Sequence, residues 1–266
     1  MSQSQPMEPQ LSGNMFLFER PELLTKETHG GKGVTRPATP FGFCSKIRAV
    51  PLTISEIPSA MKDYPVVFMS QEDPIPLAVL GLVDDVNLFV DEKGDWEQNR
   101  YIPGYIRRYP FALASETGGD RMAIVIDGAH EGVKEGGEIP FFDANGESSE
   151  ATKQAIEFCK QYEQDRQMTV QFMEQLKPLD LIKGQTAQYT PQGSTEQKVF
   201  AQYFGVDEKA LQDMSDEKFL ELRKSGLLAV IYAQLMSLSN WRLLMQRRLV
   251  RYNLSEESVL EPVTLS

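Results

Sequence analysis

Histidine and cysteine are scarce in this chain, which has only two of each among its 266 residues. Cys44 and Cys159 lie far apart in the sequence and neither belongs to a CxxC pair, so neither a disulfide framework nor a zinc site is indicated. We expect each cysteine to be a buried free thiol.

Positive charge is also in deficit, because 27 Lys and Arg residues face 38 Asp and Glu residues, for a net charge of −11. Binding to phosphates requires clustered basic residues in excess, so we do not expect nucleic acid to be the main partner. The N-terminus lacks the pattern of a secretory signal, and no apolar run approaches the roughly 18 residues of a membrane span. These patterns predict a cytoplasmic protein without a membrane span.

The composition of the chain changes at two points, after residue 40 and after residue 147. Residues 1–40 are rich in Ser, Gln, Pro and Gly and predict a flexible, mostly extended arm. Residues 41–266 predict a single α+β domain, sheet-rich over residues 41–147 and helix-rich over residues 148–266.

In the sheet-rich part, β-branched and aromatic runs at residues 45–54 and 64–70 predict two strands, separated by a short helix over residues 55–63. The turn residues Asp84 and Asp85 predict a hairpin between the apolar runs on either side, and Met122–Ile126 predicts another strand. We expect a mixed, largely antiparallel sheet.

In the helix-rich part, apolar residues recur every three or four positions from Ala151 to Leu176, which predicts one long helix ending before Pro178. A Pro/Gly turn at 191–193 predicts a hairpin. Ser215 and Gly226 have the residue types of a helix N-cap and C-terminal stop, and a more apolar helix follows. We expect these helices to pack on the sheet.

The segment Trp96–Phe111, "WEQNRYIPGYIRRYPF", concentrates aromatic and arginine residues. A helix over residues 101–109 would place Tyr101, Tyr105 and Tyr109 on one continuous face, with Arg108 at its border and Arg107 pointing away. Two interpretations stay open. The face packs on the sheet while Arg108 pairs with a structural carboxylate, or the face contacts a ligand or partner.

His130 stands in "IDGAHEG" after the predicted strand, where active-site loops often begin. A non-haem iron site would need a second histidine and a carboxylate, but position 132 is Gly and His29 lies in the predicted arm. We predict no metal, no cofactor and no catalytic residue. His130 remains a candidate contact residue, and the "HGGKG" at 29–33 is interpreted as linker because it lacks the spacing of a phosphate-binding loop.

Arg242, Arg247, Arg248 and Arg251 form a basic segment without an intervening acidic residue. The four side chains point in several directions around a helix instead of forming one stripe. They are explained either by favourable interaction with the helix C-terminus or by docking onto an acidic partner surface.

Several unusual strings occur together and in order over most of residues 48–245. They are "VPLTISEIPSAMKDYPVVF", "LGLVDDVNLFVDEKGDW", "YIPGYIRRYPFAL" and "DEKALQDMSDEKFLELRKSGLLAVIYAQLMSLSNWRLL". With these strings the chain resembles the bacterial SapC family. That family takes its name from a surface-layer gene context, and related genes often lie beside flavin-dependent halogenase-like, cupin-like and outer-membrane receptor genes.

The resemblance implies a non-catalytic binding or assembly protein, either an accessory to a neighbouring modifying enzyme of halogenase type or a surface-layer-associated protein. Its partner would be another protein or a second copy in a homodimer. The alternative is an enzyme or small-ligand binder with a pocket near Arg108 and His130.

Overall fold

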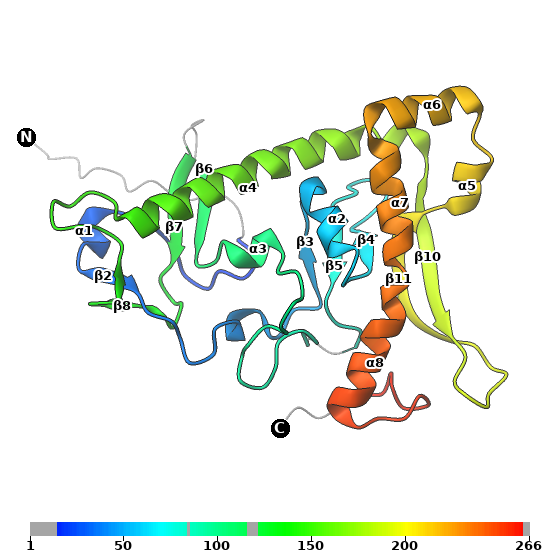
Figure 1. Cartoon of the computed structure of the whole chain (residues 1–266), viewed down its shortest axis with the longest axis horizontal. Helices are drawn as coiled ribbons and strands as arrows, with labels where there is room; N and C mark the ends of the chain where they lie inside the picture. Colours follow the sequence, from blue (N-terminus) through cyan, green and yellow to red (C-terminus); the bar gives the residue numbers. More distant parts are fainter. Residues whose placement is uncertain (1–14, 84–85, 116–121, 263–266) are drawn as a thin grey trace, which may run out of the picture. The chain divides into compact units, whose positions relative to one another are not determined.

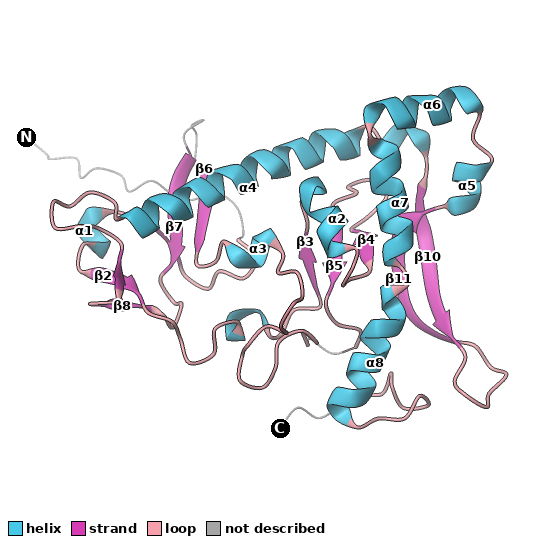
Figure 2. Cartoon of the chain, in the orientation of Figure 1, coloured by secondary structure: helices cyan, strands magenta, loops and turns pink. Residues whose placement is uncertain are grey.

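The computed structural model describes residues 15–83, 86–115 and 122–262 (Figure 1). They cluster into two compact units: unit 1 combines the chain up to Ala38 with Arg108–Glu163, and unit 2 combines Thr39–Arg107 with Gln164–Ser266. Helices and antiparallel strands occur in both (Figure 2), which confirms the α+β class. The chain passes between the units after residues 38, 107 and 163, and none of these positions coincides with the predicted change from sheet-rich to helix-rich sequence after residue 147.

Unit 1 contains two three-stranded antiparallel sheets, with the strand orders β1-β7-β6 and β8-β2-β9. Its elements are β1 (Pro21–Leu23), α1 (Lys26–His29), β2 (Lys32–Val34), β6 (Phe111–Ser115), β7 (Met122–Asp127), β8 (Val133–Glu135), β9 (Ile139–Pro140) and the first part of α4 (Glu150–Glu174).

The expectation of an extended arm is wrong for residues 21–34. Strand β1 pairs with β7, and β2 pairs with both β8 and β9, so strands of three residues gain backbone partners about a hundred positions away. Such short strands have no period that a sequence pattern could show. Gly33 of "HGGKG" allows the close pairing, since a Cβ there would lie 2.4 Å from the Ile139 carbonyl oxygen. Residues 1–14 of the expected arm lie outside the described residues.

Unit 2 is built on a five-stranded antiparallel sheet with the order β10-β11-β4-β5-β3. Its strands are β3 (Ala49–Pro51), β4 (Val66–Phe68), β5 (Pro76–Val79), β10 (Ile182–Tyr189) and β11 (Lys198–Val206). Its helices are η1 (Gly42–Cys44), η2 (Ile54–Glu56), α2 (Ile57–Ala60), α3 (Gly104–Arg107), the end of α4, η3 (Lys177–Leu179), α5 (Glu208–Gln212), α6 (Asp216–Ser225), α7 (Leu227–Ser237) and α8 (Asn240–Tyr252).

Most predicted elements are present in shortened form. The long helix is confirmed as α4, which has 25 residues and passes from unit 1 to unit 2. The hairpin around 191–193 is confirmed as β10–β11, and α6 is capped by the Ser215 side chain and ends at Gly226, with φ +83°. Both cysteines are buried free thiols. The predicted hairpin turn at Asp84–Asp85 lies outside the described residues.

Three polar side chains of the apolar α7–α8 segment bind the backbone of β4, of β11 and of the segment that precedes β4. Gln234 donates to the Val66 carbonyl oxygen at 3.0 Å and accepts from the Val206 amide at 3.2 Å. Ser237 Oγ accepts from the Val66 amide at 2.8 Å. Asn240 Nδ2 donates to the Met61 and Tyr64 carbonyl oxygens at 2.7 and 3.0 Å. Because β4 and β11 share only the Phe204↔Phe68 register pair, Gln234 and Ser237 supply hydrogen-bond partners for buried backbone groups of these strands that have none in the ladder.

We therefore predict that Gln234→Leu destabilises unit 2 by about 2–4 kcal/mol, because it leaves a buried N–H and a buried C=O without partners. Urea unfolding followed by tryptophan fluorescence measures this directly, since Trp96 and Trp241, the chain's two tryptophans, both lie in unit 2. Gln246→Leu is the matched control, because Gln246 is exposed on α8 and its loss should change stability by less than about 0.5 kcal/mol. Equal effects of the two substitutions would contradict the role assigned to Gln234.

Candidate functional site

The predicted helix over residues 101–109 is reduced to one turn, α3, so the continuous tyrosine face is wrong. Asp63 Oδ2 accepts from the Tyr101 amide at 2.9 Å, and the Tyr64 hydroxyl donates to the Tyr101 carbonyl oxygen. These contacts hold Tyr101 outside the helix, which starts only after Pro103. Tyr109 also lies beyond the helix, directly before Pro110.

The Tyr101 hydroxyl contacts a buried carboxylate. It donates to Glu56 Oε1 at 2.9 Å, while the Thr53 amide and hydroxyl donate to Glu56 Oε2 at 2.8 and 2.9 Å. Burial and the Glu56 charge raise the pKa of Tyr101 to about 12. Arg107 is exposed, but its guanidinium lies 5.6 Å from the centre of the Tyr101 ring and it donates to the Ile102 carbonyl oxygen. Tyr105 lies within α3 and is half-buried.

In unit 1, Tyr109 connects the buried Asp127 with His130. The Tyr109 hydroxyl donates to Asp127 Oδ2 at 2.8 Å, and its ring meets the His130 ring edge to face at 5.0 Å. Asp127 also accepts from the Glu19, Arg20 and Ala129 amides at 3.0 Å each. Burial opposes ionisation, but these donors outweigh it and hold the pKa of Asp127 below its ordinary value. Burial lowers the pKa of His130 against the opposing charges of Asp127 and Glu131, which favours the neutral ring at pH 7.

Arg108 faces α4. Its guanidinium carbon lies 4.8 Å from the centre of the Tyr162 ring, a cation–π arrangement, and its charge partly offsets the burial that raises the pKa of Cys159 to about 11. Among the predicted site residues, the structure therefore brings together Tyr109 and His130, while Arg108 contacts a different element. Tyr101 and Tyr105 belong to unit 2.

His29 is a structural residue. It is 1% exposed, its Nε2 lies 3.1 Å from Glu22 Oε2, and its Nδ1 lies 2.6 Å from the Thr28 hydroxyl. The Phe141 ring meets it edge to face at 6.3 Å. Across residues 15–83, 86–115 and 122–262, no group of three His, Cys, Asp or Glu side chains is placed to hold a metal ion.

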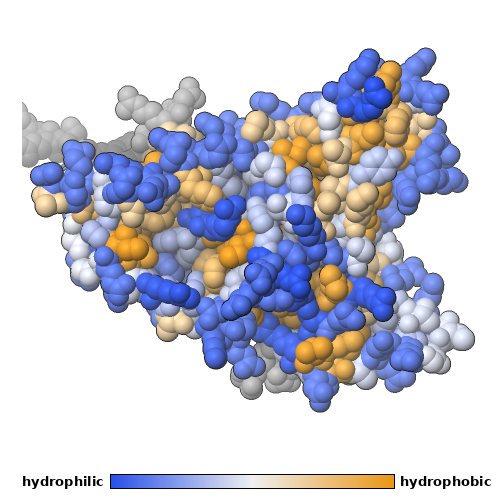
Figure 3. Space-filling model, in the orientation of Figure 1, coloured by the Kyte–Doolittle hydropathy of each residue, from blue (hydrophilic) through white to orange (hydrophobic). Residues whose placement is uncertain are grey.

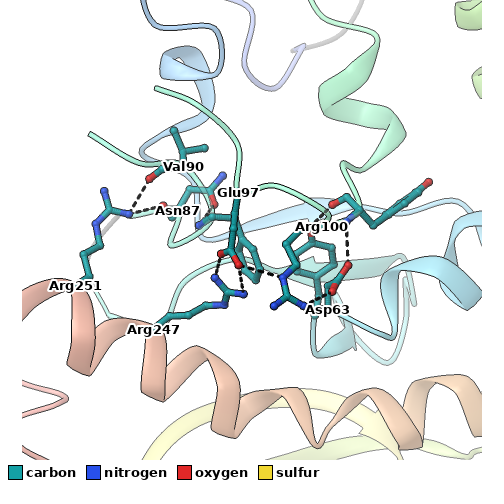
Figure 4. A network of polar contacts seen from close by, with 10 residues as sticks. Asp63, Asn87, Val90, Glu97, Arg100, Arg247 and Arg251 are labelled. Carbon is teal, nitrogen blue, oxygen red and sulfur yellow. Dashed lines mark hydrogen bonds and ion pairs between the residues drawn. The ribbon is translucent and has the colours of Figure 1, made fainter. Parts of the chain in front are cut away.

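The basic segment of α8 holds the loop between residues 87 and 97 (Figure 4). Arg247 binds Glu97 through both of its terminal nitrogens, with NH2 at 3.0 Å from Oε1, and its guanidinium lies 4.2 Å from the centre of the Phe89 ring. Glu97 also accepts from Arg100, which binds Asp63 at 3.0 Å. This network joins α8 to positions about 150 residues earlier in the chain.

Two other arginines of this segment bind carbonyl oxygens. Arg251 donates to those of Asn87 and Val90 at 3.1 and 2.8 Å, and the fully buried Arg248 donates to those of Val259 and Glu261 at 2.6 and 2.7 Å. Much of the basic segment is therefore explained by contacts within unit 2, with the residue 87–97 loop and with Val259 and Glu261, and neither of the two sequence interpretations predicted these contacts. Arg242 is exposed.

An apolar stripe follows the solvent-facing side of α7 and α8. Its side chains are 40–84% exposed, and apolar surface interrupts the hydrophilic surface over these helices (Figure 3). The stripe, called the α7–α8 ridge below, consists of Tyr232 (41%), Met236 (63%), Leu243 (40%) and Val250 (84%). A row of large apolar side chains in water is the usual mark of an interaction surface.

Hollows flank the α8 part of the ridge. One, of about 700 Å³, lies between α8 and the β10–β11 hairpin, where Tyr189, Phe200, Tyr203 and Trp241 contribute aromatic rings. The other, of about 510 Å³, is lined by Leu88 and by α8 residues that include Leu243 and Val250. Gln246 and Leu249 border both hollows, so α8 forms the wall between them.

Comparison with known proteins identifies the family. The model of the SapC family matches residues 24–244 of the 266 residues. The chain belongs to the SapC family. No curated protein matches it, and no solved structure matches it.

In this SapC-family chain, sequence reasoning found the apolar α7–α8 segment but missed the ridge. The signal was present, because Met236, Leu243 and Val250 recur at intervals of seven. It was obscured because the segment is apolar on most sides. Leu227–Tyr252 is long and apolar enough to cross a membrane by length and composition alone, which corrects the expectation that no apolar run approaches that length. Half of its most apolar window, 50%, is buried. A buried core helix has the same composition.

The Asp127 contacts give a prediction for unit 1. Asp127→Asn removes the charge and an acceptor oxygen, so the Glu19, Arg20 and Ala129 amides should exchange with deuterium at least about tenfold faster at pH 7. Because the folded pKa of Asp127 is lowered, its stabilising effect is present above the unfolded pKa of about 3.9 and is lost as the pH falls through the folded pKa.

The difference between wild type and variant should therefore shrink on acidification. Hydrogen exchange by mass spectrometry, corrected for intrinsic rates at each pH, measures it. Asp143→Asn is the matched control, because Asp143 is an exposed turn carboxylate in the same unit. If the difference in exchange rate between wild type and Asp127→Asn persisted unchanged below the folded pKa of Asp127, the Asp127 charge would not be the cause of the protection.

Proposed function

We propose that this SapC-family chain is a non-catalytic binding or assembly protein that holds another protein on the α7–α8 ridge. The observation that carries the proposal is the alignment of four large exposed side chains on one helical segment, between 40% and 84% exposed. Together they expose apolar surface to water, and burying this surface against a partner lowers the free energy.

The chemistry of the polar residues supports a binding role. His29, Glu56 and Asp127 are buried and occupied by hydrogen bonds within their own unit, and His130 packs against Tyr109. Burial also raises the pKa of both thiols, to about 12 for Cys44 and about 11 for Cys159, which disfavours the nucleophilic thiolate. We further propose that this chain serves as an accessory to a modifying enzyme encoded nearby. We also propose that it is located in the cytoplasm.

Affinity co-purification from the native cell tests the proposal. We predict that the wild-type chain retains a partner protein in stoichiometric amount and that Met236→Glu/Val250→Glu loses at least about nine-tenths of it, because a charge at the centre of an apolar contact must be desolvated.

The matched control is Met168→Glu/Val199→Glu, which changes the same residue types at 50% and 51% exposure away from the ridge. The control should retain the partner. A chain that retains no protein, or whose ridge variant keeps the same partner as the wild type, would contradict the proposed function.

A further inference from the structure

Resting on that proposed function, we propose a partner of definite chemistry: the α7–α8 ridge binds an acidic amphipathic helix of about five turns from a different protein. The geometry of the ridge, the two hollows beside α8 and the arginines at its borders point to this occupant.

The ridge has the geometry of a helix–helix contact. At 100° per residue, Tyr232, Met236 and Val250 fall within about 20° of Leu243 on a helical projection. The stripe continues from α7 into α8 because Leu238 (φ −64°, ψ −21°) and Ser239 (φ −58°, ψ −23°) keep helical dihedrals. From Tyr232 to Val250 it extends roughly 27 Å, the length of about five turns. Side chains repeating every seven residues form the seam of paired helices.

The hollows offer space for the partner's side chains. Two helices pack when the ridge of side chains on one enters the grooves beside the ridge of the other. The Leu243–Val250 part of the ridge has such a depression beside it, lined by Leu88, and the aromatic hollow lies on the other side of α8.

Charge selects an acidic occupant. From Leu227 to Tyr252 the chain carries four arginines and no acidic residue. Arg242 and Arg251 are the exposed ones, since Arg248 is fully buried and Arg247 is paired with Glu97. Arg242 lies about 100° from Leu243 on one side and Arg251 about 80° on the other, so positive charge borders the α8 part of the ridge on both sides. At the α7 end, Glu208 and Asp216 lie beside Tyr232. A second copy of this segment would set arginine against arginine, whereas glutamates flanking an apolar seam would complement it.

A lipid surface is a poorer match for the same features. A flat lipid surface would meet the ridge but would leave the hollows of about 510 and 700 Å³ beside α8 without the side chains of a packed helix. The opposite side of the segment is fixed to β4 and β11 by Gln234 and Ser237, so only the ridge remains for a partner.

The test uses the full chain and two synthetic helical peptides of 21 residues. Both have leucine at the a and d positions; one has glutamate at e and g, and the other has lysine there. Fluorescence anisotropy at low salt should show the glutamate peptide binding at least about tenfold more tightly, with the difference shrinking as salt is added.

Variants identify the surface. Leu243→Glu should weaken binding of the glutamate peptide at least about tenfold, Arg242→Glu should reduce the preference between the peptides several-fold, and Val199→Glu should change neither. Equal binding of the two peptides, no binding of either, or binding unaffected by Leu243→Glu would overturn the inference.

Two further outcomes would also overturn it. The first is a dimer of the chain, seen by light scattering, that Leu243→Glu dissociates. The second is ridge-dependent binding to vesicles with 30% anionic lipid without preference for the glutamate peptide. If native co-purification still yields a partner that depends on Met236 and Val250, the proposed function stands and only the acidic helix is excluded.

Discussion

Unit 2 depends on the buried hydrogen bonds between α7–α8 and the β4–β11 junction. A helix as apolar as α7 would pack against a sheet in several rotations if burial alone determined its orientation, because hydrophobic contact has no direction. Gln234, Ser237 and Asn240 remove that freedom, since each has backbone partners in one rotation only. Gln234 and Ser237 also complete the hydrogen bonding of a sheet in which β4 and β11 meet at a single register pair.

This fixed rotation decides which side chains reach solvent. With Gln234 and Ser237 directed at the sheet, Met236 and Val250 point outward, and the ridge follows from the orientation of the core contacts. Lower on the same segment, Arg247 and Arg251 hold the residue 87–97 loop against α8, and Leu88 of this loop lines one of the two hollows. The surface proposed for a partner is therefore built by interactions in the interior and by long-range ion pairing.

Local signals in the sequence predicted local structure. Ser215 and Gly226 placed both ends of α6, the period of α4 was visible, and the turn at residues 191–193 identified the β10–β11 hairpin. Pairing between distant strands was not predictable, because β1 and β2 have only three residues each and their partners lie far along the chain. The helix expected over residues 101–109 failed for a similar reason, as Asp63 and Tyr64 capture the Tyr101 backbone. Which side chains of α7–α8 are exposed also depends on tertiary contacts, and the helical periodicity of the sequence does not show these contacts.

Thiol labelling measures the central claim that α7–α8 has one fixed rotation with the ridge in water. The native thiols are buried and their pKa values are raised, so single Met236→Cys and Ile231→Cys variants can be compared with iodoacetamide in the folded chain. Met236 is 63% exposed and Ile231 is 0% exposed. The account predicts that the cysteine at 236 reacts at close to the rate of an unfolded peptide and that the one at 231 is protected at least about a hundredfold. Equal rates, or protection at 236, would contradict it.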